Sequence, residues 1–330
     1  MNPIGKNKQT GYTLPMDPYV VVVGGTNQDI CGKSTKPLVC RDSNPGTVWA
    51  TLGGVGHNIA LNMAKLGLSV FFITAVGDDD AGRAVLTEAD QCGLHLVLPP
   101  FHGASTGRYV YLCGPDGNME LAVNDMQATT LLTPQSLAPC ERLVRDASLV
   151  VAEANLQPET LRYVGGICDR LVVDPVSTIK MGRLEGMWDR ISVFKPNRLE
   201  AEMLSHVSID SPENLNKACT ALLALGMKSV VVSLGEDGAC YADSKRFIRL
   251  PVIMGNDVVD TTGCGDAFVA GFCFGLMEKG IDSVRYALAS ALGASSITAA
   301  CEETVNPHLD RNALIDVLDA HTTYWEGAMI

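Results

Sequence analysis

The sequence predicts an α/β fold: a doubly wound, mostly parallel sheet with a small β-strand lid. Short apolar runs rich in β-branched residues are typical of strands buried on both faces of a parallel sheet, and residues 19–23 form the first. Helical stretches of about 10 to 15 residues separate these runs, as in repeated βα units. A 330-residue chain with 47% hydrophobic residues can also bury one large core.

The other elements are expected at intervals along the chain. Residues 70–76 form a second buried strand, and Gly77 with Asp78, Asp79 and Asp80 precedes the next helix. Three carboxylates resemble a metal cluster, but capping of that helix explains them more simply. Further buried strands are expected over residues 149–152, 171–173, 191–194 and 230–233. Helices are expected over residues 58–66, 81–91, 267–279, 283–299 and 309–320.

Two segments are expected to form the lid, over about residues 30–50 and 104–126. The first is polar and interrupted by two prolines, which favours short edge strands or a flap over core structure. In the second, apolar runs flank Gly114-Pro115-Asp116-Gly117, a sequence typical of a hairpin turn.

Composition and charge indicate a small ligand rather than a polymer. The net charge is −12 and the basic residues do not gather into a run, which disfavours nucleic acid and an anionic membrane as partners. Eleven cysteines, an odd number without a C-x-x-C pair, indicate neither a zinc site nor a disulfide framework and fit a reducing, cytoplasmic location. Residues 1–18 lack the apolar core of a signal peptide and are expected to form a flexible arm, with the folded domain over residues 19–330.

The stretch Asp260-Thr261-Thr262-Gly263-Cys264-Gly265-Asp266 carries the most specific chemical signal. It precedes an apolar helix, and its two glycines leave backbone N–H groups bare at the positive end of the helix dipole, which suits an anion. A carboxylate beside a phosphate is repelled unless it takes a proton from the attacking group, so Asp266 points to phosphoryl transfer. The alternative is an ordinary strand-to-helix turn with an acidic first turn. An accessible Cys264 is expected to have a lowered thiol pKa at this position.

Other polar residues lie where strands are expected to end. Thr26, Asn27 and Asp29 follow the first strand, at the edge where open α/β sheets bind ligands. Asn197 and Glu200 share one side of a helix start. Capping accounts for Asn197 alone, and the pair is also suited to a hydrated Mg²⁺.

Two glycine-rich segments resemble nucleotide-binding motifs and are rejected. Gly32-Lys33-Ser34 matches the end of a P-loop, but Asn27 occupies the position of that motif's first glycine. Gly53-Gly54-Val55-Gly56 is not the dinucleotide fingerprint, because Ile59 stands where the third glycine belongs.

Two blocks resemble the signatures of the ribokinase-like (phosphofructokinase B) family of sugar and nucleoside kinases. They are Gly53-Gly54-Val55-Gly56-His57-Asn58-Ile59-Ala60 and Asp260 to Asp266 with Ala267-Phe268, and their order and wide separation also match. The resemblance extends from about residue 19 to about residue 318 and implies a doubly wound α/β domain with a β lid. It also implies ATP and Mg²⁺ as cofactors, K⁺ as a further cation, a small-molecule sugar or nucleoside as acceptor, and a homodimer formed through the lid.

The resemblance also implies roles for individual residues. Asp266 is the general base, and the N–H groups of Gly263, Cys264 and Gly265 form the anion hole for the transferring phosphoryl group. The family usually has Ala or another small residue at position 264, so the thiol of Cys264 must point away from the phosphate. The substrate-binding positions are Thr26, Asn27, Asp29, Gly53, Gly54, Gly56, Asn58, Asn124 and Asn155. The ATP-binding positions are Asn197, Lys180, Ser233, Gly235 and Gly238, and the metal positions are Asn197 and Glu200 for Mg²⁺ through water and Asp260 and Thr262 for a monovalent cation.

Four further segments resemble the family members that phosphorylate pseudouridine: residues 42–46, 124–126, 174–177 and 195–202. This likeness implies ATP-dependent phosphorylation of pseudouridine at O5′. A selective site would place an acceptor opposite the ring N1–H that uridine lacks, and Gln28, Asn124 and Asp125 are candidates. The alternatives are a kinase of another sugar or nucleoside and a catalytically silent sensor of a nucleoside or ATP.

Overall fold

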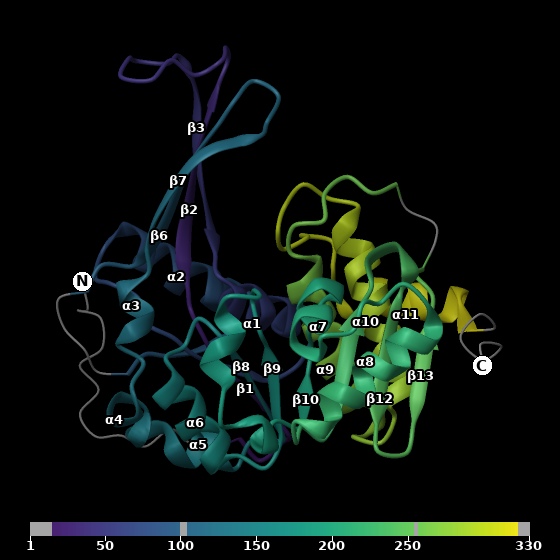
Figure 1. The fold of residues 1–330 in the computed structure, drawn as a ribbon. Coiled ribbons are helices and arrows are strands. Elements are labelled where there is room, and N and C mark those ends of the chain that lie inside the picture. Colours follow the sequence, from purple (N-terminus) through teal and green to yellow (C-terminus); the bar gives the residue numbers. More distant parts are fainter. Residues whose placement is uncertain (1–14, 100–103, 254–256, 323–330) are drawn as a thin grey trace.

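The computed structural model describes residues 15–99, 104–253 and 257–322, and it contains two β-sheets (Figure 1). The larger sheet consists of β1 (Val20–Val23), β4 (Val70–Ile73), β5 (His95–Val97), β8 (Leu149–Glu153), β9 (Leu171–Asp174), β10 (Val193–Phe194), β11 (Ser229–Ser233), β12 (Ala239–Asp243) and β13 (Phe247–Leu250). Its strand order is β13-β12-β11-β10-β9-β8-β1-β4-β5. Neighbours pair in parallel except at one edge, where β12 is antiparallel to β11 and β13. The predicted doubly wound, mostly parallel sheet is confirmed.

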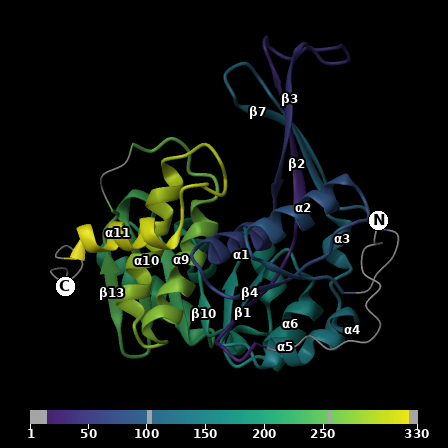
Figure 2. The same cartoon turned by 180° about the vertical axis from the view of Figure 1, so that it is seen from behind.

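Helices cover both faces of this sheet, which Figures 1 and 2 show from opposite sides. They are α1 (Val55–Lys65), α2 (Asp80–Gln91), α3 (Gln127–Thr130), α4 (Pro134–Leu137), α5 (Glu141–Arg145), α6 (Pro158–Ile167), α7 (Arg198–Ser205), α8 (Pro212–Ala224), α9 (Cys264–Lys279), α10 (Val284–Ala299) and α11 (Arg311–Ala320). Short 3₁₀ turns are η1 (Ala138–Cys140), η2 (Lys180–Leu184), η3 (Trp188–Arg190) and η4 (Gly235–Asp237).

The side chains of β1 enter two separate cores. Val20 and Val22 belong to the core that contains α1, α9 and α10, whereas Val21 and Val23 belong to the core that contains α5, α6 and α8. Because successive side chains of a strand point to opposite faces, a strand covered on both sides must be apolar throughout. This explains the uninterrupted run of valines.

The first strand lies inside the sheet rather than at its edge. Val20 of β1 pairs with Val70 of β4 on one side and with Leu149 of β8 on the other. The chain therefore winds outward through β4 and β5 in one direction and through β8 to β13 in the other. In such sheets the ligand crevice lies outside the carboxyl ends of the strands at this reversal, here β1 and β8.

The smaller sheet is the lid, which projects from the body of the protein (Figure 1). Its strands are β2 (Asn27–Ser34), β3 (Gly46–Gly53), β6 (Gly107–Cys113) and β7 (Met119–Asp125), in the order β3-β2-β6-β7. The predicted hairpin is confirmed as β6 and β7. The expectation of edge strands over residues 30–50 holds for β3, which lies at the edge of the lid sheet, and is wrong for β2, which pairs along its length with both β3 and β6.

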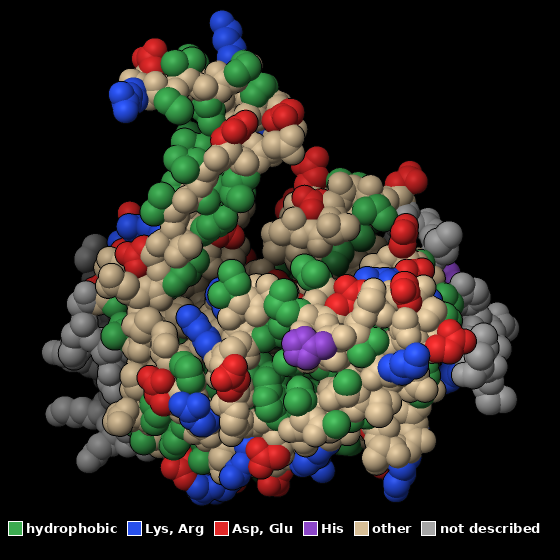
Figure 3. Space-filling view, viewed as in Figure 1, with side chains coloured by type: hydrophobic (Ala, Val, Ile, Leu, Met, Phe, Trp, Pro, Cys, Tyr) green, Lys and Arg blue, Asp and Glu red, His purple; other side chains and the backbone are tan. Residues whose placement is uncertain are grey.

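The two faces of the lid differ in character. Directly paired residues on neighbouring strands share a face. One row consists of Thr51, Asp29, Tyr109 and Asn124. On the opposite face, the exposed large hydrophobic side chains are Val48, Val110, Leu112, Leu121 and Val123. Figure 3 shows hydrophobic side chains gathered along the lid.

Some elements differ from their expected bounds for local reasons. Helix α1 begins at Val55 rather than at residue 58, because Gly54 adopts a positive φ of 104° and lets the glycine-rich segment form the first turn. The strands β5, β12 and β13 were not predicted, because each lacks a long apolar run. Most of the expected N-terminal arm lies outside the described residues. Within the part of the chain that the structure describes, no helix is long and apolar enough to cross a membrane.

Candidate active site

The turn before α9 creates the N–H cluster that the sequence predicts. Gly263 is the N-cap of α9 with a φ of 79°, and a Cβ built on it would lie 1.9 Å from the carbonyl oxygen of Thr304. Only glycine fits this position without strain. Gly265 and Asp266 lie in the first helical turn, where N–H groups have no intrahelical acceptor. The N–H of Cys264 differs, since it donates to the carbonyl oxygen of Thr261 at 3.2 Å and is partly used within the turn.

The carboxylate of Asp266 lies between these N–H groups and α1. Its Oδ2 accepts a hydrogen bond from Nδ2 of Asn58 at 2.8 Å. Removal from solvent raises the pKa of Asp266 to about 7, with the negative charge of Asp174 acting in the same direction and the Asn58 bond and Lys195 opposing it. A carboxylate that titrates near neutral pH is suited to accept a proton from an alcohol and to release it afterwards.

A buried lysine supplies positive charge beside the turn. Nζ of Lys195 donates to Oδ2 of Asp174 at 3.0 Å, and both side chains are only 8% exposed. A Cβ on Gly265 would lie 3.3 Å from this Nζ, so the cation borders the N–H cluster. Burial lowers the pKa of Lys195, but the charges of Asp174, Glu200 and Asp266 outweigh burial and the net pKa is raised. No role was predicted for Lys195 or Asp174.

Another unassigned carboxylate, Glu153, joins the two strands at the reversal of the sheet. It ends β8, is fully buried, and accepts hydrogen bonds from the N–H groups of Gly25 at 2.7 Å and Asn155 at 2.6 Å. Burial raises its pKa to about 7 against the effect of these two donors. The loop is also tightly packed against α1, since a Cβ on Gly24 would lie 2.8 Å from the Cα of Gly56.

Four of the predicted substrate positions, Asn27, Asp29, Gly53 and Gly54, meet at the base of the lid. Asn27 donates from Nδ2 to Oδ1 of Asp29 at 2.5 Å. A Cβ on Gly53 would lie 2.3 Å from Oδ2 of Asp29, so a glycine is needed for the carboxylate to lie there. Burial raises the pKa of Asp29. Thr26 is directed elsewhere, because its buried hydroxyl is bonded to the hydroxyl of Thr74 at 2.9 Å.

The three lid residues considered for base recognition do not share a face. Asn124 lies in the row of Asp29. Gln28 and Asp125 each lie one residue away from that row, and the side-chain period of two in a strand directs them to the opposite face. This corrects the grouping of all three. Tyr109 occupies the place between Asp29 and Asn124 in the row, a position that the sequence analysis did not consider.

The predicted nucleotide positions gather at the ends of β10 and β11, with Lys180 apart from them. Asn197 pairs with Ser233 in an isolated parallel bridge. Gly235 begins the following 3₁₀ turn, and Gly238 ends it with a φ of 85°. Nζ of Lys180 instead donates to Oδ1 of Asn155, beyond β8. Burial lowers the pKa of Lys180.

Asn197 and Glu200 contact each other directly. Oδ1 of Asn197 accepts from the N–H of Glu200 at 2.9 Å, and Oε2 of Glu200 accepts from the N–H of Asn197 at 2.8 Å. This is a reciprocal capping box at the start of α7. Capping therefore accounts for both residues and not for Asn197 alone. Glu200 is buried, and burial raises its pKa.

Comparison with known proteins identifies the family to which the chain belongs. Residues 17–311 match the pfkB family of carbohydrate kinases. The chain belongs to this family. It is 34% identical over 309 residues to the pseudouridine kinase of Escherichia coli (strain K12), and the aligned region covers 91% of this chain and 96% of that kinase. It is also 34% identical over 316 residues to a protein of the same strain named as an uncharacterized sugar kinase, with coverage of 94% and 86%.

The fold of a solved relative is also similar. The structure of Arabidopsis thaliana ribokinase complexed with ribose and ATP matches with a TM-score of 0.80 and 25% identity, over 92% of this chain and 99% of that one. As a pfkB family member with these relatives, the protein is a ribokinase-like phosphotransferase that acts on a sugar or nucleoside. The resemblance on which the sequence analysis depends is thus confirmed.

The loop before α9 is held by one aspartate. Oδ1 of Asp260 accepts from both the N–H and the hydroxyl of Thr262, each at 2.7 Å. These two bonds lower the pKa of Asp260. Across residues 15–99, 104–253 and 257–322, no group of three or more His, Cys, Asp or Glu side chains is arranged to hold a metal ion.

Two smaller expectations have opposite outcomes. Asp79 caps α2, since its Oδ1 accepts from the N–H of Gly82 at 2.9 Å, so the capping interpretation is confirmed for Asp79, while Asp78 and Asp80 pair with Arg83. The lowered pKa expected for Cys264 is wrong, because burial raises the pKa of this thiol to about 11. The thiol donates to the carbonyl oxygen of Ser295 on α10 at 3.6 Å, so it points away from the N–H cluster.

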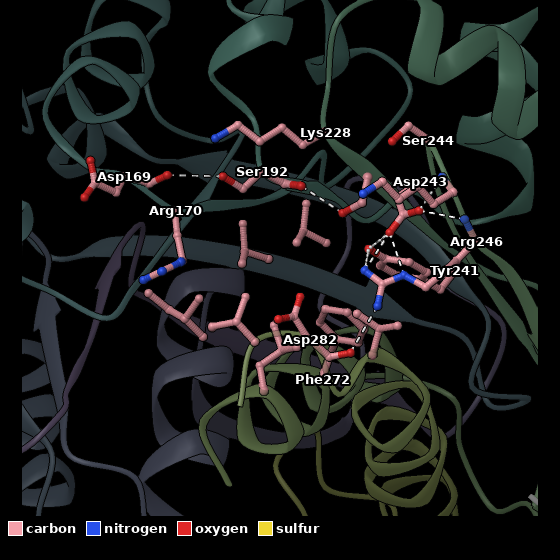
Figure 4. A pocket seen from close by; sticks show the side chains of 18 residues that line it. Asp169, Arg170, Ser192, Lys228, Tyr241, Asp243, Ser244, Arg246, Phe272 and Asp282 are labelled. Atoms are coloured by element: carbon pink, nitrogen blue, oxygen red, sulfur yellow. Dashed lines mark hydrogen bonds and ion pairs between the residues drawn. The ribbon is translucent and has the colours of Figure 1, made fainter. Parts of the chain in front are cut away.

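A cavity of about 630 Å³ lies at the opposite, amino-terminal edge of the sheet (Figure 4). Arg170, Ser192 and Lys228 line the cavity, and each lies directly before the first residue of a strand. Asp266, in contrast, lies in the first turn of α9, at the carboxyl-terminal edge of the sheet. Figure 4 also shows Arg246 paired with Asp243, at 2.7 Å. This cavity is therefore separate from the kinase site.

Proposed function

We propose that this kinase transfers the γ-phosphoryl group of ATP to O5′ of pseudouridine, with Asp266 as the general base. The observation that supports the base assignment is the position of Asp266 at the N-terminus of α9, hydrogen-bonded to Asn58, with a pKa of about 7. The identity of the acceptor is supported by the 34% identity to the E. coli pseudouridine kinase over nearly the whole chain.

In the proposed reaction Asp266 accepts the proton of the O5′ hydroxyl as that oxygen attacks the γ-phosphorus. A bond forms between O5′ and phosphorus, the bond to the β-phosphate oxygen breaks, and ADP leaves with the electron pair. The N–H groups of Gly263 and Gly265 and the ammonium of Lys195 stabilise the charge on the transferring group, with a smaller share from the N–H of Cys264. Rate therefore depends on positioning and on preorganised charge.

Mg²⁺ supplies charge neutralisation of the ATP phosphates when it is bound. Asn197 and Glu200 would hold its water ligands. Their capping box engages Oε2 of Glu200, which leaves the second carboxylate oxygen for a water-mediated contact and fits an indirect role. Asp260 and Thr262 would border a monovalent cation such as K⁺.

We assign recognition of the nucleoside to residues at the base of the lid. Asn27, Asp29 and Asn58, together with Gly53 and Gly54, would hold the ribose hydroxyls, and Asn155 would contact the substrate from the end of β8. Asn124 shares the lid face of Asp29, and its side-chain carbonyl is the acceptor that we propose for N1–H of pseudouridine. Tyr109 lies between them in the same row and offers an aromatic ring for stacking on the base.

A second copy of the chain would cover the other face of the lid. The row Ala50, Ile30, Val110 and Val123 is apolar from edge to edge, and Val110 and Val123 are 40% and 67% exposed. Large exposed apolar patches are rare on monomers and mark interfaces. We propose a homodimer formed through this face. Eleven free cysteines support the reducing cytosol as its compartment.

The test of this function is a panel of acceptors with mass detection of the product. Pseudouridine, uridine, adenosine and ribose are compared at equal ATP, and pseudouridine should give the highest kcat/KM. A site built around a hydrogen bond to the substrate disfavours an acceptor that lacks this bond by up to about 10⁴-fold in kcat/KM. Equal rates for uridine would show that N1–H is not read, and a preference for ribose or adenosine would move the assignment to another kinase of the family. Absence of ATP turnover with every acceptor would support a nucleoside or ATP sensor.

A further inference from the structure

A chain of hydrogen bonds runs from the surface of α2 to the base. Oε2 of Glu88 lies 2.7 Å from Nε2 of His57, and Nδ1 of His57 lies 3.2 Å from Oδ1 of Asn58. Nδ2 of Asn58 then donates to Asp266 at 2.8 Å. His57 is 2% exposed and its ring centroid is 6.4 Å from that of Phe72, whereas the Glu88 side chain is 34% exposed. The chain thus connects solvent with the reacting group through a buried ring.

The donors and acceptors along this chain fix the number of protons on His57. An ionised Asp266 has no proton to give, so the amide NH₂ of Asn58 must face it and the amide oxygen must face His57. That oxygen accepts only, so Nδ1 of His57 must carry a proton. The carboxylate of Glu88 also accepts only, so Nε2 must carry a proton as well. Both ring nitrogens are then donors, which is the imidazolium form.

We infer that His57, held as an imidazolium by Glu88, is a positioning residue that orients the Asn58 amide so that its NH₂ group faces the ionised base. The titratable groups that face His57 are Glu88 from α2, Asp29 from β2 and, through Asn58, Asp266 from α9. All three are acids, and the ring of Phe72 on β4 lies nearby, with its centroid 6.4 Å from that of His57.

Loss of one ring proton reverses the amide. With a neutral His57 that bonds Glu88 through Nε2–H, Nδ1 becomes an acceptor and the NH₂ of Asn58 turns toward it. The amide oxygen then faces Asp266 and stabilises its protonated form, which cannot act as a base. The direction of one amide thus couples the charge of His57 to the charge of Asp266.

This inference rests on the proposed role of Asp266, and paired variants of His57 test it. In His57→Asn the shorter amide reaches the Nδ1 position and can still donate to Asn58, whereas in His57→Gln the longer amide reaches Glu88 and leaves Asn58 without a donor. We expect His57→Asn to keep kcat within about threefold of wild type and His57→Gln to lose about tenfold, with KM for ATP unchanged in both. Both variants bury an amide in the same place, so a general packing defect lowers both alike. Equal kcat values for the two would overturn the inference.

A second measurement does not depend on turnover. Side-chain ¹⁵N NMR of the wild-type protein at pH 7, with the His57 signals assigned by their loss in His57→Gln, should show both ring nitrogens protonated. Glu88→Gln, at the partly exposed end of the hydrogen-bond chain, should shift one of the two ¹⁵N signals toward the chemical shift of an unprotonated ring nitrogen and should lower kcat. Asp90→Asn, at an exposed position of the same helix, should do neither. One unprotonated nitrogen in the wild type would refute the imidazolium. If no acceptor is phosphorylated, the proposed function fails, and this spectrum still decides the charge of His57.

Discussion

The substitution Asp266→Asn keeps the shape of the side chain and removes its ability to take a proton. The new amide oxygen can still accept the hydrogen bond from Asn58, so the local geometry is preserved. General base catalysis typically contributes 10²- to 10⁴-fold, and we expect turnover to fall by roughly 10² or more. Because the loss concerns a transition-state interaction, KM for ATP should change little.

The same substitution should stabilise the fold at neutral pH. The pKa of Asp266 is about 7 in the folded protein against an ordinary value of 3.8. Ionising an acid with a raised pKa opposes folding, so the penalty is absent below the unfolded pKa, grows between about pH 4 and pH 7, and is complete above pH 7. A pKa raised from 3.8 to about 7, at about 1.4 kcal/mol per pH unit, sets an upper limit near 4 kcal/mol for the gain in the free energy of unfolding. Asp266 is only partly buried, and solvent screening reduces this to about 1–2 kcal/mol.

The assay combines turnover with thermal melting at pH 5 and pH 8. Wild-type turnover should rise through about pH 7, and the difference in Tm between variant and wild type should be larger at pH 8 than at pH 5. Asp90→Asn, an exposed aspartate on α2, serves as the matched control and should change neither quantity. Retention of more than about a tenth of wild-type turnover would remove Asp266 from the role of base. An equal Tm difference at both pH values would show that its carboxylate is not desolvated.

Three further predictions concern the turn before α9 and the capping box of α7. Gly263→Ala forces a Cβ against the carbonyl oxygen of Thr304 at a residue with a positive φ. Tm should therefore fall by several degrees and turnover should fall with it, and an unchanged Tm would contradict the packing described. Cys264 should be alkylated slowly at pH 8 with or without ATP, because burial raises its pKa to about 11, and rapid labelling in peptide mass spectrometry would refute its burial. Asn197→Ala removes the cap on the N–H of Glu200 and should reduce the free energy of unfolding by about 1 kcal/mol in urea titrations, whereas Asn197→Asp should retain it.

Residues whose environment follows from local sequence were predictable. The parallel strands were found because burial on both faces demands uninterrupted apolar runs, and Asp266 was found because a glycine turn before a helix makes a recognisable anion site. The hydrogen bond between Asn58 and Asp266 joins residues 208 positions apart, and no local pattern reports it. The pKa of Cys264 was missed for the same reason, since its burial depends on packing against α10.

The sequence does contain a pattern that identifies the three charged site residues that were not predicted. Glu153, Asp174 and Lys195 each end or directly follow an apolar strand of the central sheet. A charged residue at the carboxyl end of a buried parallel strand faces the ligand edge, where its desolvation has to be offset by partners or by a ligand. The strands β12 and β13 gave no comparable signal, because their short sequences combine apolar and polar residues.

The central place of β1 in the sheet has a consequence for synthesis of the chain. Val20 pairs with Leu149, so β1 emerges from the ribosome roughly 130 residues before one of its two partners. At about 5–20 residues per second, that edge of β1 stays unpaired for roughly 6–26 s. During this interval a run of four valines and its backbone donors and acceptors are open to other nascent chains. We therefore expect slow refolding and a benefit from chaperones at high expression levels.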